Sequence, residues 1–82
     1  MRFGGDIIDE REIIGFGQLW EKVDSSGHHT QWFDILLRSG GRLPNFVGDV
    51  WQGSYNDDEK LNRAEYERRI ELIDSLVRQR SI

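Results

Sequence analysis

The chain has 82 residues, one proline, no cysteine and a formal net charge of −4 at pH 7. This length predicts a single domain over residues 1–82, and the lack of cysteine excludes disulfides, thiolate metal sites and cysteine nucleophiles. The acidic balance argues against nucleic acid as a partner, because nucleic acid requires a basic surface. The longest uninterrupted apolar run is Ile35–Leu37, so we expect no membrane span and a cytoplasmic protein.

The first part of the chain, residues 1–53, is rich in predicted strands. The segment Glu12–Val23 mixes β-branched and aromatic residues with Gly15 and Gly17. This composition predicts a strand that is bent or bulged near the two glycines. Residues 2–8 are expected to add a short strand at most.

Two further strands follow a turn cluster at Asp24–Thr30. Gln31–Ser39 is the clearest strand of the chain. Residues 42–51 predict a third strand, which Pro44 places at the edge of the sheet or interrupts near its start. The connection between them fits a two-residue hairpin loop in which Gly40 and Gly41 both adopt positive φ.

From about residue 57 to 80 the apolar residues no longer alternate as in a strand but recur every three or four positions, which predicts an amphipathic helix. Asn56 with Glu59 and Asn62 with Glu65 are competing N-terminal capping boxes. One apolar stripe is expected to face the sheet, formed by Tyr66, Ile70, Ile73 and Val77 and widened by Leu61, Leu72 and Leu76.

Together these elements predict an α+β fold: a three- to four-stranded antiparallel meander with one C-terminal amphipathic helix packed on one face. Alternation along the second strand separates Phe33, Ile35 and Leu37 from Trp32, Asp34, Leu36 and Arg38. On the first strand it separates Ile14, Phe16 and Trp20 from Ile13, Leu19 and Val23, and on the third Leu43 and Val47 from Phe46 and Val50.

One helix covers only one face of such a sheet, so the other face is left with large apolar side chains. An exposed aromatic patch of this kind exceeds what most soluble monomers present to water. Three explanations are open. The N-terminal segment covers the patch, or a bulge shifts the strand faces; two copies of the chain associate through it as a homodimer; or a different protein binds there.

Adjacent histidines, His28 and His29, lie in the turn cluster, where we expect structural or solvated side chains rather than a metal site or an acid–base pair. The acids between Asp6 and Glu12 are likewise expected to be solvated. "GFGQLW" lacks the third glycine of a dinucleotide fingerprint, and no P-loop or nucleophile elbow is present. We therefore expect no enzyme, no cofactor and no metal.

The two arginines around the glycine pair, Arg38 and Arg42, could clamp an anion, although the same residues suit an ordinary hairpin corner. Asp34 is expected at an edge, paired to one of these arginines, or presented to a partner. Arg69 lies within the apolar arc of the helix, where it pairs with Glu65 or reaches a partner.

We therefore expect a small non-enzymatic regulator or inhibitor that binds another protein and acts by steric occlusion. Small acidic chains without cysteine are frequent among inhibitors carried by phages and other mobile elements, including anti-CRISPR proteins, and this class frequency alone motivates that finer expectation. The alternatives are a nucleotide-binding protein and a self-associating subunit of a larger complex. The expected partner-binding residues are Trp20, Trp32, Asp34, Leu36, Arg38, Arg42, Trp51 and Arg69.

Overall fold

The computed structural model describes residues 2–3 and 6–80. Its strands are β1 (Arg2–Phe3), β2 (Asp6–Ile7), β3 (Ile13–Val23), β4 (His29–Leu37) and β5 (Arg42–Val50). The helices are the short 3₁₀ turns η1 (Glu10–Glu12) and η2 (Gln52–Ser54) and the long helix α1 (Tyr55–Arg80). Across these described residues, no helix combines the length and the apolar character needed to cross a membrane.

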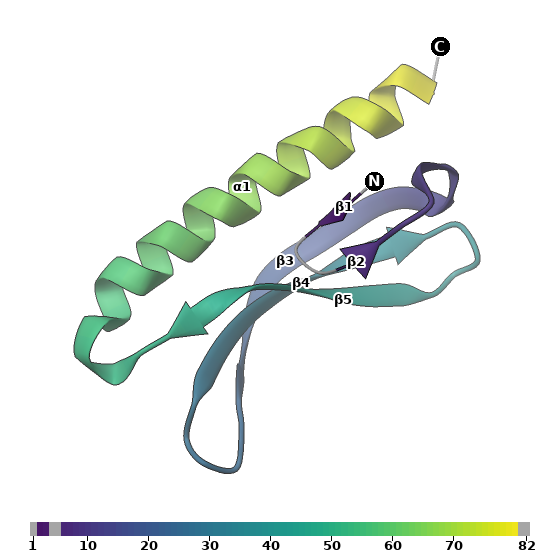
Figure 1. Cartoon of the computed structure of the whole chain (residues 1–82). Coiled ribbons are helices and arrows are strands. Elements are labelled where there is room, and N and C mark those ends of the chain that lie inside the picture. The colour runs from purple at the N-terminus through teal and green to yellow at the C-terminus, as the bar shows by residue number, and fades with distance from the viewer. Residues whose placement is uncertain (1, 4–5, 81–82) are drawn as a thin grey trace.

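The predicted α+β fold is confirmed. Strands β3, β4 and β5 form an antiparallel sheet in that order, and α1 packs across one face of it, over β3 and β5 (Figure 1). β1 and β2 pair separately as a small antiparallel ladder. The core between α1 and the sheet is formed by Ile8, Ile13, Phe33, Ile35, Tyr66 and Ile73.

The segment that follows β2 lies on the helix side of the sheet. Ile8 is 6% exposed and belongs to the same core cluster as Ile13 and Ile73, and β1 and β2 are seen beneath the C-terminal half of α1 in Figure 1. The described part of the N-terminal segment therefore adds to the covered face. Ile8 therefore does not cover the opposite face, as one form of the first explanation for the apolar surplus would require. The other form of that explanation, bulges that shift the strand faces, agrees with the register of the sheet.

Bulges change the faces predicted for β3. The register with β4 shifts between Ile13 and Gly15 and again between Phe16 and Leu19. Each extra residue reverses the inside–outside alternation, so Phe16 packs against the core together with Leu19. The expectation that Phe16 shares a face with Trp20 was wrong, while the predicted bulging near the glycines is confirmed.

A similar shift affects β5, where the register changes between Gln31 and Trp32 of the partner strand. Beyond the shift, Val50 pairs with His29 and is 1% exposed, whereas Phe46 pairs with Trp32 and is 38% exposed. The predicted pairing of Phe46 and Val50 on one face was therefore wrong. Pro44 lies in β5, which is an edge strand as predicted.

Both hairpins of the sheet use a three-residue loop. The Leu37 N–H donates to Gly41 O at 3.0 Å and the Gly40 N–H to Leu37 O at 2.9 Å. Gly40 has φ +92°, whereas Gly41 is not in the positive-φ region. The predicted two-residue loop was therefore wrong, because only one left-handed residue is needed when a type I turn closes the hairpin.

The helix starts at Tyr55, two residues earlier than predicted. Asp58 rather than an asparagine holds the preceding turn, since its Oδ2 accepts the Trp51 N–H at 2.9 Å and the Ser54 hydroxyl at 2.7 Å. Asn56 and Asn62 both lie inside the helix, so neither is its N-cap.

Asn62 instead joins α1 to the sheet. Its Nδ2 donates to Gln31 Oε1 at 2.9 Å and to Asp49 O at 3.0 Å. Gly48 makes room for this contact, because a Cβ at that position would overlap the Asn62 amide.

Arg69 makes a second polar connection and is 7% exposed. Its guanidinium donates to Asn45 Oδ1 at 2.9 Å, to Phe46 O at 2.8 Å and to Glu65 Oε2 at 2.8 Å. The predicted pairing with Glu65 is confirmed. Because Asn62 and Arg69 occupy the inner side of α1, the predicted stripe is narrower than expected, and Leu61 and Leu72 are 69% and 46% exposed.

Candidate functional site

The sheet face opposite α1 carries a row of three aromatic side chains, one from each strand. Register places Trp20 beside Trp32 and Trp32 beside Phe46. The rings of Trp20 and Trp32 are stacked with centroids 5.9 Å apart, and Phe46 meets Trp32 edge-on at 5.3 Å. Trp20 and Phe46 are 37% and 38% exposed. We call these three residues the aromatic row.

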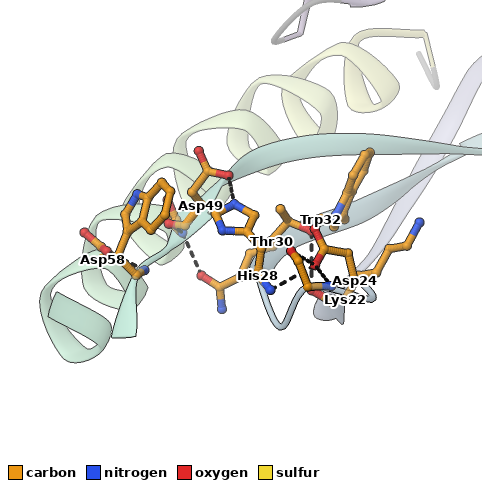
Figure 2. Close-up of polar contacts among 11 residues, drawn as sticks. Lys22, Asp24, His28, Thr30, Trp32, Asp49 and Asp58 are labelled. Carbon is orange, nitrogen blue, oxygen red and sulfur yellow. Dashed lines mark hydrogen bonds and ion pairs between the residues drawn. The ribbon is translucent and has the colours of Figure 1, made fainter. Parts of the chain in front are cut away.

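Hydrogen bonds from both indoles fix the aromatic row in place. Trp32 Nε1 donates to Thr30 Oγ1 at 2.8 Å, and that hydroxyl donates in turn to Lys22 O at 3.4 Å (Figure 2). Trp20 Nε1 donates to Asp34 Oδ1 at 3.2 Å. Because both indole N–H groups are bonded within the chain, the row presents an apolar surface in which the positions of the two tryptophans are set before any partner arrives.

Charged and apolar residues extend this surface toward the β4–β5 hairpin. Asp34 lies on the central strand and Arg42 Nη1 lies 3.9 Å from its Oδ2. The Arg42 side chain is 73% exposed and that of Asp34 is 23% exposed. Of the alternatives for Asp34, the edge position was wrong and the pairing to an arginine is confirmed. We call this surface the open face; it comprises Trp20, Trp32, Asp34, Leu36, Arg42, Pro44 and Phe46.

Three of the predicted partner-binding residues lie elsewhere. Arg38 lines a shallow hollow with Asp9, Arg11 and Glu12, while Arg42 pairs across to Leu36 on the open face. The two arginines of the hairpin therefore lie on different sides of the turn and do not converge as an anion clamp. Arg69 lies on the inner side of α1, where it donates to Asn45 and Phe46, and Trp51 follows the end of β5.

The two histidines are each bonded to a carboxylate. His28 Nε2 lies 2.8 Å from Asp49 Oδ1 (Figure 2), and His29 Nδ1 lies 3.0 Å from Glu21 Oε2. The His28 ring also contacts the Trp51 ring, with centroids 4.5 Å apart. The expectation of structural histidines is supported by these contacts. Within residues 2–3 and 6–80, no group of three or more potential ligands could hold a metal ion.

Sequence reasoning missed Phe46 as a member of the open face and Thr30 as the residue that holds the Trp32 indole. The alternation along β4 could have found Thr30, because Thr30, Trp32 and Asp34 are spaced by two and point the same way. Phe46 could not be found in this way, because its position opposite Trp32 depends on the loop length and on the register shift near Trp32.

Comparison of the chain with protein-family models, with curated proteins and with solved structures finds no match.

Proposed function

We propose that this protein is a small non-enzymatic regulator that binds another protein through the open face and acts by covering part of that protein's surface. The observation that carries the proposal is the aromatic row, whose two indoles are hydrogen-bonded within the chain and which α1 leaves uncovered. Tryptophan and arginine are the residues most enriched at binding hot spots, and the open face contains two tryptophans beside Arg42.

The charged residues beside the aromatic row, Asp34 and Arg42, would fix the orientation of the bound partner. Arg42 is largely exposed and is only loosely paired with Asp34 at 3.9 Å, so its guanidinium is free to turn toward a carboxylate on the partner. An apolar centre with charged groups at its margin is the usual arrangement of a protein–protein interface. We expect the apolar row to supply most of the affinity and Arg42 to set the orientation.

The lack of cysteine supports action in the cytoplasm. An inhibitor carried by a phage or another mobile element remains a finer prediction, based on how often such chains have this size and charge. The nucleotide-binding alternative has less support, because Arg38 and Arg42 diverge around the hairpin.

The test is capture of partners by the tagged protein from cells of its source, comparing the wild type with Trp32→Ser. Leu61→Ser is the matched control, because Leu61 is an apolar residue exposed on α1, away from the open face. A single stoichiometric partner that the control retains and Trp32→Ser loses supports the proposal. Equal retention by both variants contradicts it, and recovery of the protein alone favours self-association through the same face.

A further inference from the structure

A groove runs between the tip of the β3–β4 hairpin, Ser26–His29, and the connection from β5 to α1, Val50–Tyr55. Four of the residues that line it carry aromatic or imidazole rings: His28, His29, Trp51 and Tyr55. Trp51 is 59% exposed and Tyr55 is 36% exposed, and the rings of His28 and His29 stand against them at centroid distances of 4.5 and 6.0 Å. A tryptophan exposed to this extent beside a groove offers an unoccupied π face.

Every ring-bearing residue that lines the groove is also bonded to a carboxylate. The His28 ring contacts Asp49, the His29 ring and the Tyr55 hydroxyl both contact Glu21, and the Trp51 backbone N–H donates to Asp58. No lysine or arginine is among the lining residues. The rings therefore form the walls of the groove and the negative charges lie around them.

Hydrogen bonds favour the ionised form of two of these carboxylates, Glu21 and Asp58. The hydrogen bond from His29, joined by that from Tyr55, lowers the pKa of Glu21. The Trp51 backbone N–H, joined by the Ser54 hydroxyl, lowers the pKa of Asp58. Asp57 and Asp58 in the first turn of α1 also offset the positive end of the helix dipole, which would otherwise disfavour a cation here.

We propose that this groove binds the guanidinium group of an arginine side chain from a protein partner. A planar cation with apolar faces stacks on tryptophan and tyrosine rings, and the carboxylates bonded to the lining residues make the surroundings of the groove negative without lining it themselves. A lysine ammonium would meet the same charge without the stacking, and an anion would be repelled.

The groove is linked to the open face through a chain of contacts: His28 of the groove contacts Asp49, Asp49 pairs with Thr30 in the sheet, and Thr30 holds the Trp32 indole. The inference rests on the proposed function in one respect, namely that the arginine belongs to the protein bound there. Three strands between Thr30 and Leu36 offer about 300 Å² of surface, whereas a standard interface uses about 800 Å² per partner. A second contact beyond the sheet would bring the interface closer to that size.

The test is an NMR titration of the full chain with a capped Gly-Arg-Gly peptide, following the Trp51 indole N–H and the amides of His29 and Tyr55. The matched probes are the same peptide with lysine and with citrulline, which keeps the shape and removes the charge. We expect saturable shifts in the millimolar range with arginine, and binding weaker by about tenfold with citrulline. Non-saturating shifts, or equal binding of citrulline, would overturn the proposal.

Two variants locate the site. Trp51→Ala removes the exposed ring and keeps the backbone N–H bonded to Asp58, so it should weaken arginine binding by about tenfold. Trp20→Ala removes a tryptophan of the open face and should leave it unchanged. If Trp51→Ala binds the arginine peptide as the wild type does, the groove is not the site.

A further arm uses free L-arginine, in which an α-ammonium and an α-carboxylate replace the neutral amides of the capped peptide. We expect it to bind more weakly than the capped peptide; equal or tighter binding would overturn a side chain as the source. Because the titration contains no partner protein, its failure leaves the open-face proposal standing. A failure of the capture experiment likewise leaves the arginine site to be decided by the titration.

Discussion

The two faces of β4 differ in how completely their large side chains are buried. Toward α1, Phe33 and Ile35 are fully buried, and polar residues between helix and sheet are bonded to one another. Among the described residues, no buried side-chain nitrogen or oxygen on that side or elsewhere lacks a partner. Away from α1, Trp32 and its neighbours are held in place by hydrogen bonds but are only partly covered.

This difference distinguishes inner-face residues, whose burial stabilises the fold, from outer-face residues, which the fold holds in position without burying fully. Burial of the inner face supplies the apolar free energy that a domain of this size requires. The outer face keeps large rings in fixed positions without burying them fully, which adds little to folding and leaves a binding surface. Substitutions on the inner face should therefore mainly lower the free energy of unfolding, and substitutions on the outer face should mainly weaken binding.

The largest effect is expected from Phe33→Ala. Phe33 is 0% exposed and contacts Tyr66 edge-on at 5.3 Å, so its removal leaves a cavity and lowers the free energy of unfolding by about 3–5 kcal/mol. Chemical denaturation measures the loss. Trp32→Ala, the adjacent residue on the open face, should lower it by only about 2 kcal/mol, and equal losses would contradict the contrast between the faces.

Arg69→Met should lower the free energy of unfolding by about 2–4 kcal/mol. The methionine retains the apolar stem but removes the guanidinium, which donates hydrogen bonds to Asn45 Oδ1 and Phe46 O. Both oxygens then lose the hydrogen bond from this residue. Arg68→Met is the matched control, because Arg68 also bonds Glu65 but its side chain is 61% exposed. That variant should change stability by less than about 1 kcal/mol, and denaturation curves of the two compare them.

Gly48→Ala should lower the free energy of unfolding by about 1–3 kcal/mol, because the new methyl displaces Asn62 from Gln31 and Asp49 O. Gly53→Ala serves as the control, since no atom lies within 4 Å of its added Cβ. If the two variants have the same free energy of unfolding, the Asn62 contact contributes nothing measurable to stability.

Acid should weaken the inner face through Glu65. Hydrogen bonds from Arg68, and then from Arg69, lower the pKa of Glu65 from 4.5 to about 2. The folded state therefore favours the carboxylate, and this stabilisation is fully present above pH 4.5 and is lost as the pH falls through about 2. Because the Glu65 side chain is 31% exposed, we expect a loss of about 1–2 kcal/mol.

The check is denaturation of the wild type and of Glu65→Gln across this pH range. The difference in stability between them should be largest near neutral pH and shrink toward pH 2. A difference that stays constant with pH would show that the Glu65 charge does not act as described.

Much of the fold follows from periodicity in the sequence. The alternation along Gln31–Ser39 separated Phe33 and Ile35 from Trp32 and Asp34, and the helical period found α1. These predictions hold because burial of one face dominates the energy of a strand or helix.

The features that could not be predicted depend on contacts distant in sequence. Two bulges in β3 turn Phe16 inward, and glycine marks only the neighbourhood of a bulge, not the residue at which the register shifts. Asn62 was read as a cap and Arg69 as an interruption of an apolar arc, whereas Gln31 and Asn45 on the sheet explain both. For the site, Trp20, Trp32, Asp34, Leu36 and Arg42 were predicted and lie together, but Phe46 required the observed register.

The most direct measurement of the central claim is the affinity of the captured partner for Trp20→Ser relative to Leu72→Ser. Both replace a partly exposed apolar side chain, one on the open face and one on α1. If the open face is the binding surface, Trp20→Ser weakens binding by at least about tenfold while Leu72→Ser retains the wild-type affinity. Equal affinities for the two variants, or a loss confined to Leu72→Ser, would contradict the claim.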